Sequence, residues 1–302
     1  MLEPLCLSLT KMIHHYTSAA TLKLILANRT IRFRRADLLD DESEVPFQHA
    51  LVHRKSFFIS SWSQATVGEA GMWSRYGDFD QGVRLSVDTL RFPWSPLSLE
   101  ISRGTGRLKP DGTPQRVGLK VTDLLVPFSK ETFLGNGYIA TPMSGDLQET
   151  FGGRVHYATD PQAVIAQLIN VTNEGITVRG DGSILARVKD SGWADQAEYR
   201  FVLHAIRGPA MVYTADPAAY ERSMVNMVEA ALERMVFADL HPEVEFIDLP
   251  LAYDAFDDLT VTLGPAMTAE QQQATIEDVH ALAPSVRVVP SALRIKPRPR
   301  PA

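Results

Sequence analysis

Residues 13–18 read Ile13-His14-His15-Tyr16-Thr17-Ser18 and lead directly into segment 19–31. An apolar run that ends in hydroxyl residues is typical of a strand followed by a helix, because a hydroxyl oxygen accepts a hydrogen bond from a free N–H of the first helical turn. The spacing of Leu22, Ile25 and Leu26 predicts one apolar helix face that packs against a sheet. The stretch therefore predicts a strand and a helix at the start of the fold.

The two histidines of this strand have two interpretations. Consecutive strand residues point to opposite faces of a sheet, so His14 and His15 fit ordinary strand positions. A histidine at a strand end also fits a small-molecule site, where a few polar groups converge. The local pattern leaves both interpretations open.

Composition limits the class of protein. The chain has 302 residues, of which 45% are hydrophobic and 22% charged, enough for a substantial core. A net charge of −6 argues against nucleic-acid binding by bulk electrostatics. The single cysteine, Cys6, cannot form an internal disulfide, which fits a reducing, cytoplasmic setting, and no apolar run is long enough to predict a membrane span.

The C-terminal part has the clearest order of elements. Strand-like segments at 259–263 and 286–289 flank a helical pattern at 268–282, which predicts a parallel βαβ unit. We find no internal repeat and no linker composition. Residues 1–295 are therefore expected to form a single domain, followed by a flexible tail at 296–302 in which Pro alternates with Lys or Arg.

Three further stretches carry chemistry with more than one interpretation. The acidic run from Asp40 to Glu44 is either a solvated loop or, with the histidines, part of a metal-dependent nuclease site, although it lacks the spacing of a calcium loop. Trp73 and Tyr76 are either core aromatics or a stacking wall for a flat ring, with Arg75 available for a phosphate. We expect no metal site from Cys and His spacing.

The third stretch is a strand that begins at Glu198. Glu198 and Arg200 alternate with Tyr199 and Phe201, which is typical of a half-buried strand. The two charged residues share a face and fit either a structural ion pair or a catalytic carboxylate beside an arginine.

Several motifs together resemble a bacterial family called domain of unknown function 2971. They are, in chain order, His15-Tyr16-Thr17-Ser18, Ile31-Arg32-Phe33, Met72-Trp73-Ser74-Arg75-Tyr76, Gly82-Val83-Arg84-Leu85, Trp193, Glu198-Tyr199-Arg200 and Leu263-Gly264-Pro265. The resemblance covers nearly the whole chain. The family pattern Asn-Asp-Pro-x-Glu reads Asp40-Asp41-Glu42-Ser43-Glu44 here, so the asparagine and proline are missing.

A weaker resemblance is to the ADP-ribosyltransferase superfamily, particularly its DNA-modifying toxins and RNA phosphotransferases. It rests on His15-x-Thr17, the Leu-rich helix and the late Glu198, and Ser60-Ser61 resembles the Ser-Thr-Ser strand of one branch. The resemblance implies an α+β fold with a mixed, mainly antiparallel split sheet and flanking helices, besides the C-terminal βαβ unit.

The same resemblance implies roles for individual residues. His15 with Thr17 would bind the adenosine ribose, Tyr76 or Trp73 would stack on nicotinamide, and Glu198 would hold the nicotinamide ribose. The expected catalytic residues are Glu198, His15 and Tyr76. The expected NAD-binding residues are His15, Tyr16, Thr17, Ser61, Trp73, Arg75 and Tyr76.

The resemblance implies an enzyme that consumes NAD as a substrate, by ADP-ribosyl transfer to a nucleic-acid or protein acceptor or by NAD hydrolysis, in a toxin or phage-defence setting. A carboxylate near the 2′-hydroxyl stabilises the oxocarbenium-like state more than the ground state. The alternatives are a non-catalytic module that binds a nucleotide or a partner on the same fold and, below it, the metal-dependent nuclease.

Overall fold

A mixed, mostly antiparallel sheet with helices around it forms the body of the protein. The computed structural model describes residues 12–47, 52–65, 69–108, 111–172, 175–234 and 240–295. The predicted tail at 296–302 and Cys6 lie outside the described residues. The α+β class expected from the sequence is confirmed.

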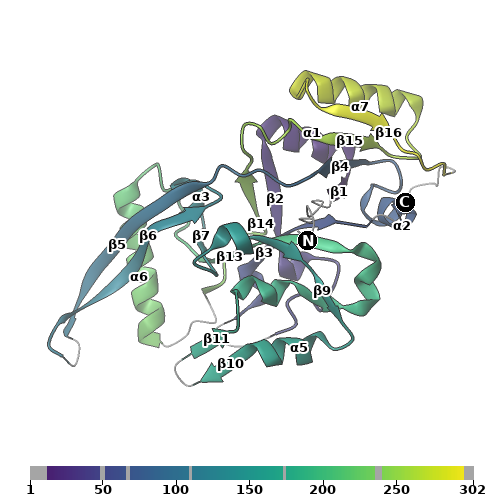
Figure 1. Cartoon of the computed structure of the whole chain (residues 1–302). Helices are drawn as coiled ribbons and strands as arrows, with labels where there is room; N and C mark the ends of the chain where they lie inside the picture. The colour runs from purple at the N-terminus through teal and green to yellow at the C-terminus, as the bar shows by residue number, and fades with distance from the viewer. Residues whose placement is uncertain are drawn as a thin grey trace, which may run out of the picture.

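Figure 1 shows the large sheet in the middle of the molecule, with α7 above it and the β5–β6 hairpin extending away beside α6. The path of the sheet is β14-β2-β3-β1-β4-β15-β16, and β13 pairs with β3, β7 and β8. Its strands are β1 (Ile13–Thr17), β2 (Thr30–Arg35), β3 (Phe57–Ser63), β4 (Val83–Val87), β7 (Tyr138–Thr141), β8 (Gly152–Arg154), β13 (Glu198–Arg207), β14 (Phe246–Pro250), β15 (Thr260–Leu263) and β16 (Arg287–Pro290).

Among the described residues, the remaining strands form three two-stranded sheets: β5 (Ser95–Leu108) with β6 (Pro114–Val126), β9 (His156–Ala158) with β12 (Val188–Asp190), and β10 (Ile169–Thr172) with β11 (Gly175–Val178). The α-helices are α1 (Ala19–Asn28), α2 (Glu69–Tyr76), α3 (Lys130–Phe133), α4 (Leu147–Thr150), α5 (Pro161–Leu168), α6 (Pro217–Arg234) and α7 (Ala269–Leu282). The short 3-10 helices are η1 (Ala36–Leu38), η2 (Arg54–Ser56), η3 (Gly182–Ala186) and η4 (Ser191–Gln196).

The opening stretch folds as its pattern predicts. The hydroxyl of Ser18 accepts a hydrogen bond from the backbone N–H of Thr21 at 3.1 Å and caps α1. Leu22, Ile25 and Leu26 are the buried residues of α1. The helix ends where Arg29 takes a left-handed conformation with φ of 51°, and the chain turns at once into β2.

The C-terminal βαβ unit is also confirmed. β15 and β16 pair in parallel, with Val261 opposite Val288, and α7 connects them. Thr268 and Gln271 cap α7 reciprocally through side chain and backbone, which fixes the start of the helix. None of the described helices is long and apolar enough to cross a membrane.

Candidate functional site

The central feature of the sheet is a gap between β1 and β2. Along one edge, β3 pairs with β13 over its whole length, from Glu198 opposite Ser63 to His204 opposite Phe57. The other edge of β3 is shared, since β2 reaches it only at Phe58 and Ile59 and β1 only at Ser63. In the described register, residues 60–62 have no partner from β1 or β2, so these two strands diverge and leave an opening.

A cleft of about 550 Å³ occupies this opening. Its volume is in the range of small-molecule sites. It is lined by parts of β1, α1, β2, β3, α2, β12, η4, β13 and β14 and by the loop after η1. Six of the residues predicted for the site line it: His15, Tyr16, Thr17, Ser61, Tyr76 and Glu198.

His15 reaches the cleft through the gap. By strand register, Glu198 leaves the sheet on the same face as Ser63 and His14, whereas His15 leaves on the opposite face and lies against Trp62 with ring centroids 5.1 Å apart. His15 and Glu198 therefore line one cleft only because the sheet is open between β1 and β2.

The hydrogen bond of His15 fixes its tautomer. Nδ1 lies 3.0 Å from the carbonyl oxygen of Ser61, and because a carbonyl only accepts, Nδ1 carries the proton. Burial lowers the pKa of His15, with the bond to Ser61 opposing it in part. A neutral ring protonated at Nδ1 has its lone pair on Nε2, which can accept a hydrogen bond from a ligand hydroxyl.

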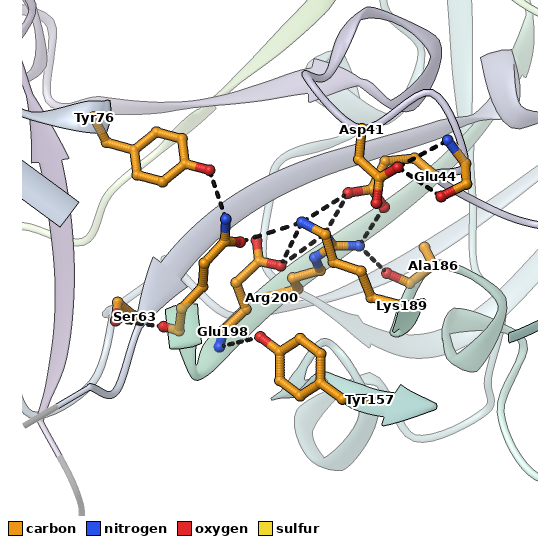
Figure 2. A network of polar contacts seen from close by, with 11 residues as sticks. Asp41, Glu44, Ser63, Tyr76, Tyr157, Ala186, Lys189, Glu198 and Arg200 are labelled. Carbon is orange, nitrogen blue, oxygen red and sulfur yellow. Dashed lines mark hydrogen bonds and ion pairs between the residues drawn. The ribbon is translucent and has the colours of Figure 1, made fainter. Parts of the chain in front are cut away.

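The carboxylate of Glu198 belongs to a buried network of four charged residues (Figure 2). Its Oε2 accepts hydrogen bonds from Lys189 Nζ at 3.1 Å and from Arg200 at 2.9 Å. Arg200 also donates to both carboxylate oxygens of Glu44, at 2.6 and 2.7 Å. All four side chains are at most 8% exposed, and their formal charges sum to zero. We call this set, Glu44, Lys189, Glu198 and Arg200, the buried charge network.

The network keeps Glu198 ionised. Burial by itself would raise the pKa of Glu198, but the charges of Arg200 and Lys189 outweigh it and hold the pKa below its usual range. Both of these cations bond to Oε2, and among the described residues no donor reaches Oε1. The ion-pair interpretation of Glu198 and Arg200 is thus confirmed, and it leaves one carboxylate oxygen available to a ligand.

Tyr76 is tied to this network through Gln196 (Figure 2). Gln196 Nε2 donates to the Tyr76 hydroxyl at 2.7 Å, and Gln196 Oε1 accepts from Lys189 Nζ at 3.2 Å. The backbone N–H of Glu198 donates to the Tyr157 hydroxyl at 2.8 Å. The aromatic ring of Tyr76 and the carboxylate of Glu198 are therefore held by one continuous set of hydrogen bonds.

Two of the predicted binding residues lie elsewhere. Trp73 is fully buried and packs edge-on against Tyr16 at 5.0 Å between ring centroids. Arg75 pairs with Asp195, and neither Trp73 nor Arg75 is among the residues that line the cleft. Tyr76 lines the cleft and Trp73 does not, so of these two aromatics Tyr76 alone remains a candidate for stacking on a ligand.

The acidic run is not simply a solvated loop. Asp40 and Glu42 are exposed, but Glu44 is 3% exposed and pairs with Arg200. Asp41 accepts from the backbone and hydroxyl of Ser43. Among the described residues, no three His, Cys, Asp or Glu side chains converge as metal ligands.

Sequence reasoning found Arg200 as a partner of Glu198 but missed Lys189 and Glu44, the other two members of the network. Lys189 lies on β12, nine residues before Glu198, and Glu44 is separated from Arg200 by 156 positions. Only Glu198 and Arg200, two residues apart on one strand, share a short-range pattern that the sequence reveals. Gln196, which joins Tyr76 to Lys189, has no periodic signal because it lies at the end of η4.

Comparison with known proteins adds no identification: no family model matches the chain, and no curated protein or solved structure matches it significantly. The fold and the site define an α+β protein with a cleft of mixed polar and apolar lining at an opening in its main sheet.

Proposed function

We propose that the protein is an NAD-consuming enzyme with an ADP-ribosyltransferase-like fold. The observation that supports this most is that His15, Tyr76 and Glu198, far apart in the sequence, line one cleft at the opening between β1 and β2. A split sheet with these three residue types is what the resemblance to that superfamily implies. The order of the sequence motifs likewise supports membership in the family called domain of unknown function 2971.

In the proposed reaction, the bond between C1′ of the ribose and the pyridinium nitrogen breaks, and its electron pair moves to the ring nitrogen and releases neutral nicotinamide. Glu198 Oε1 accepts a hydrogen bond from the ribose 2′-hydroxyl and stabilises the positive charge that develops on the sugar. Water or an acceptor nucleophile then bonds to C1′ and gives up its proton to solvent. Tyr76 stacks on the nicotinamide ring, and Nε2 of neutral His15 accepts from a hydroxyl of the adenosine ribose.

One observation favours a second candidate, a binding module without catalysis. Oε2 of Glu198 is shared by two cations, so the four charges of the network largely cancel. A carboxylate neutralised in this way stabilises a developing cation less than a free one does. In this case the cleft would bind NAD or ADP-ribose and leave it intact.

Release of nicotinamide from NAD by the purified protein tests the proposal. Glu198→Gln keeps the shape of the side chain and removes its charge, and we expect turnover to fall about 10²-fold or more. Glu44→Gln is the matched control, because it removes the same charge from the same network but no atom assigned to the reaction. Circular dichroism and thermal unfolding of both variants report whether each is folded.

The outcomes separate the two candidates. Nicotinamide release that Glu198→Gln abolishes and Glu44→Gln largely keeps supports the enzyme. A thermal shift with NAD or ADP-ribose but no product supports the binding module. Neither release nor a thermal shift contradicts both.

A further inference from the structure

Arg34 differs from the other cations that line the cleft. Arg32, Arg34, Lys189 and Arg200 all line it. Lys189 and Arg200 are bound within the buried charge network. Arg32 donates to both carboxylate oxygens of Asp248 at 2.8 and 2.9 Å and stacks over Phe246. Arg34 is exposed and has no hydrogen bond, ion pair or ring contact from its side chain among the described residues.

The strand register places Arg34 on the same face of the sheet as Glu198. Arg34 lies opposite Ile59, and Ile59 lies opposite Val202 of β13, which alternates in step with Glu198 and Arg200. Side chains two residues apart on a strand share a face, so Arg34 and Glu198 lie on the same side of the sheet.

The distance between Arg34 and Glu198 limits which ligands can contact both side chains. Glu198 is opposite Ser63, four residues along β3 from Ile59, and β3 lies between β2 and β13. At ~3.3 Å per residue and ~4.8 Å per strand, the Cα atoms of Arg34 and Glu198 are on the order of 16 Å apart. The arginine side chain covers part of this span. A ribose held at Glu198 has to carry a 5′-substituent to reach the guanidinium.

The side chains that line the cleft carry charges of both signs. Asp40 and Asp41 also line it, and neither pairs with a cation among the described residues. The described residues that line the cleft therefore have no general excess of positive charge. The unneutralised guanidinium of Arg34 is a localised positive charge, and an anionic group gains most at that end of the cleft.

We propose that Arg34 binds a phosphate of the nucleotide whose nicotinamide ribose is held by Glu198. This inference rests on the proposed function and deepens it. A guanidinium binds phosphate oxygens through paired N–H donors, so Arg34 selects nicotinamide nucleotides over the unphosphorylated nucleoside.

The test compares NAD, nicotinamide mononucleotide and nicotinamide riboside as substrates of Arg34→Gln. We expect kcat/KM for NAD to fall about 10- to 100-fold, the usual effect of losing one charge-assisted hydrogen bond. The value for nicotinamide riboside, which has no phosphate, should stay within about twofold of the wild type. A loss with nicotinamide mononucleotide assigns the contact to the nicotinamide-side phosphate, and a loss with NAD alone assigns it to the adenosine side. Arg32→Gln is the matched control, on the same strand and face but already neutralised by Asp248, and it should leave all three substrates within about threefold.

A binding experiment keeps this inference separate from the proposed function. The wild-type thermal shift by ADP-ribose, relative to adenosine, should be lost in Arg34→Gln and kept in Arg32→Gln, whether or not nicotinamide is released. If no nicotinamide is released but ADP-ribose still gives a thermal shift that depends on Arg34, the proposed enzymatic function is contradicted and the phosphate site is supported. An equal loss with NAD and nicotinamide riboside, an unchanged kcat/KM for NAD, or no wild-type shift with ADP-ribose overturns the role of Arg34.

Discussion

Replacement of Arg200 by Met measures how strongly the buried charge network holds the site together. Met fills a similar volume, so the change removes a charge without opening a large cavity. It leaves Glu44 and Glu198 buried with only Lys189 to balance them, and Glu44 loses its donors to both carboxylate oxygens. Breaking a buried ion pair by removing one partner costs about 3 to 5 kcal/mol. Nε of Arg200 is buried and has no hydrogen-bond partner, which destabilises the wild type, and the substitution removes this atom. We therefore expect a loss at the lower end of that range, about 3 kcal/mol in the free energy of unfolding.

Urea unfolding followed by tryptophan fluorescence at pH 7.5 gives the free energy of unfolding. Arg32→Met is the control, because its pair with Asp248 has side chains 54% and 34% exposed and should contribute at most about 1 kcal/mol. In Arg200→Met, the pKa of Glu198 loses the charge that lowers it most. Protonation of a carboxyl group then removes the excess negative charge, so the deficit should shrink as the pH falls from 7.5 to 5. A loss no larger than that of Arg32→Met, or a deficit independent of pH, would refute this reasoning.

Two further predictions concern the rings of His204 and Tyr76. Burial lowers the pKa of His204 to about 4, against about 6.5 in the unfolded chain, so the unfolded state binds a proton that the folded state does not. The free energy of unfolding of the wild type should therefore fall by about 2 kcal/mol between pH 7 and pH 5, and that of His204→Asn should fall clearly less. Urea titrations at both pH values measure this difference, and an equal pH dependence of the two proteins would contradict the prediction. Tyr76→Phe keeps the ring but removes the acceptor of Gln196, so it should cost about 1 kcal/mol of stability and change KM for NAD little. Tyr76→Ala should raise KM about tenfold or more, because it removes the stacking surface; similar KM values for the two variants would mean that the ring does not contact NAD.

Local patterns predicted those parts of the fold whose interactions lie close together in the sequence. Ser18 caps α1, the apolar positions of α1 are buried, and β15, α7 and β16 form a parallel unit. The cap and the apolar face of α1 depend on hydrogen bonds and spacing within about a dozen residues, and the parallel pair follows from the order strand, helix, strand, so both are visible in a linear sequence.

The same patterns could not decide between a structural and a functional Glu198. Alternation along β13 placed Glu198 and Arg200 on one face, which was correct, but the charge state of Glu198 depends also on Lys189 of β12. Arg200 in turn pairs with Glu44. The acidic run around Glu44 indicated a solvated loop, but in the structure Glu44 is buried.

The sequence by itself determined that residues 13–28 form a strand and a capped helix, but it predicted His15 at a strand end, and the structure places His15 in the middle of β1. Only the tertiary structure decided that this strand leaves β3 after a single paired position, because strand divergence arises from how β1, β2 and β13 share the two edges of β3. That divergence gives His15 access to the cleft of Glu198 and Tyr76. The tertiary structure also places Trp73 in the core and Arg34 on the cleft wall, since burial and pairing depend on neighbours that are distant in the sequence.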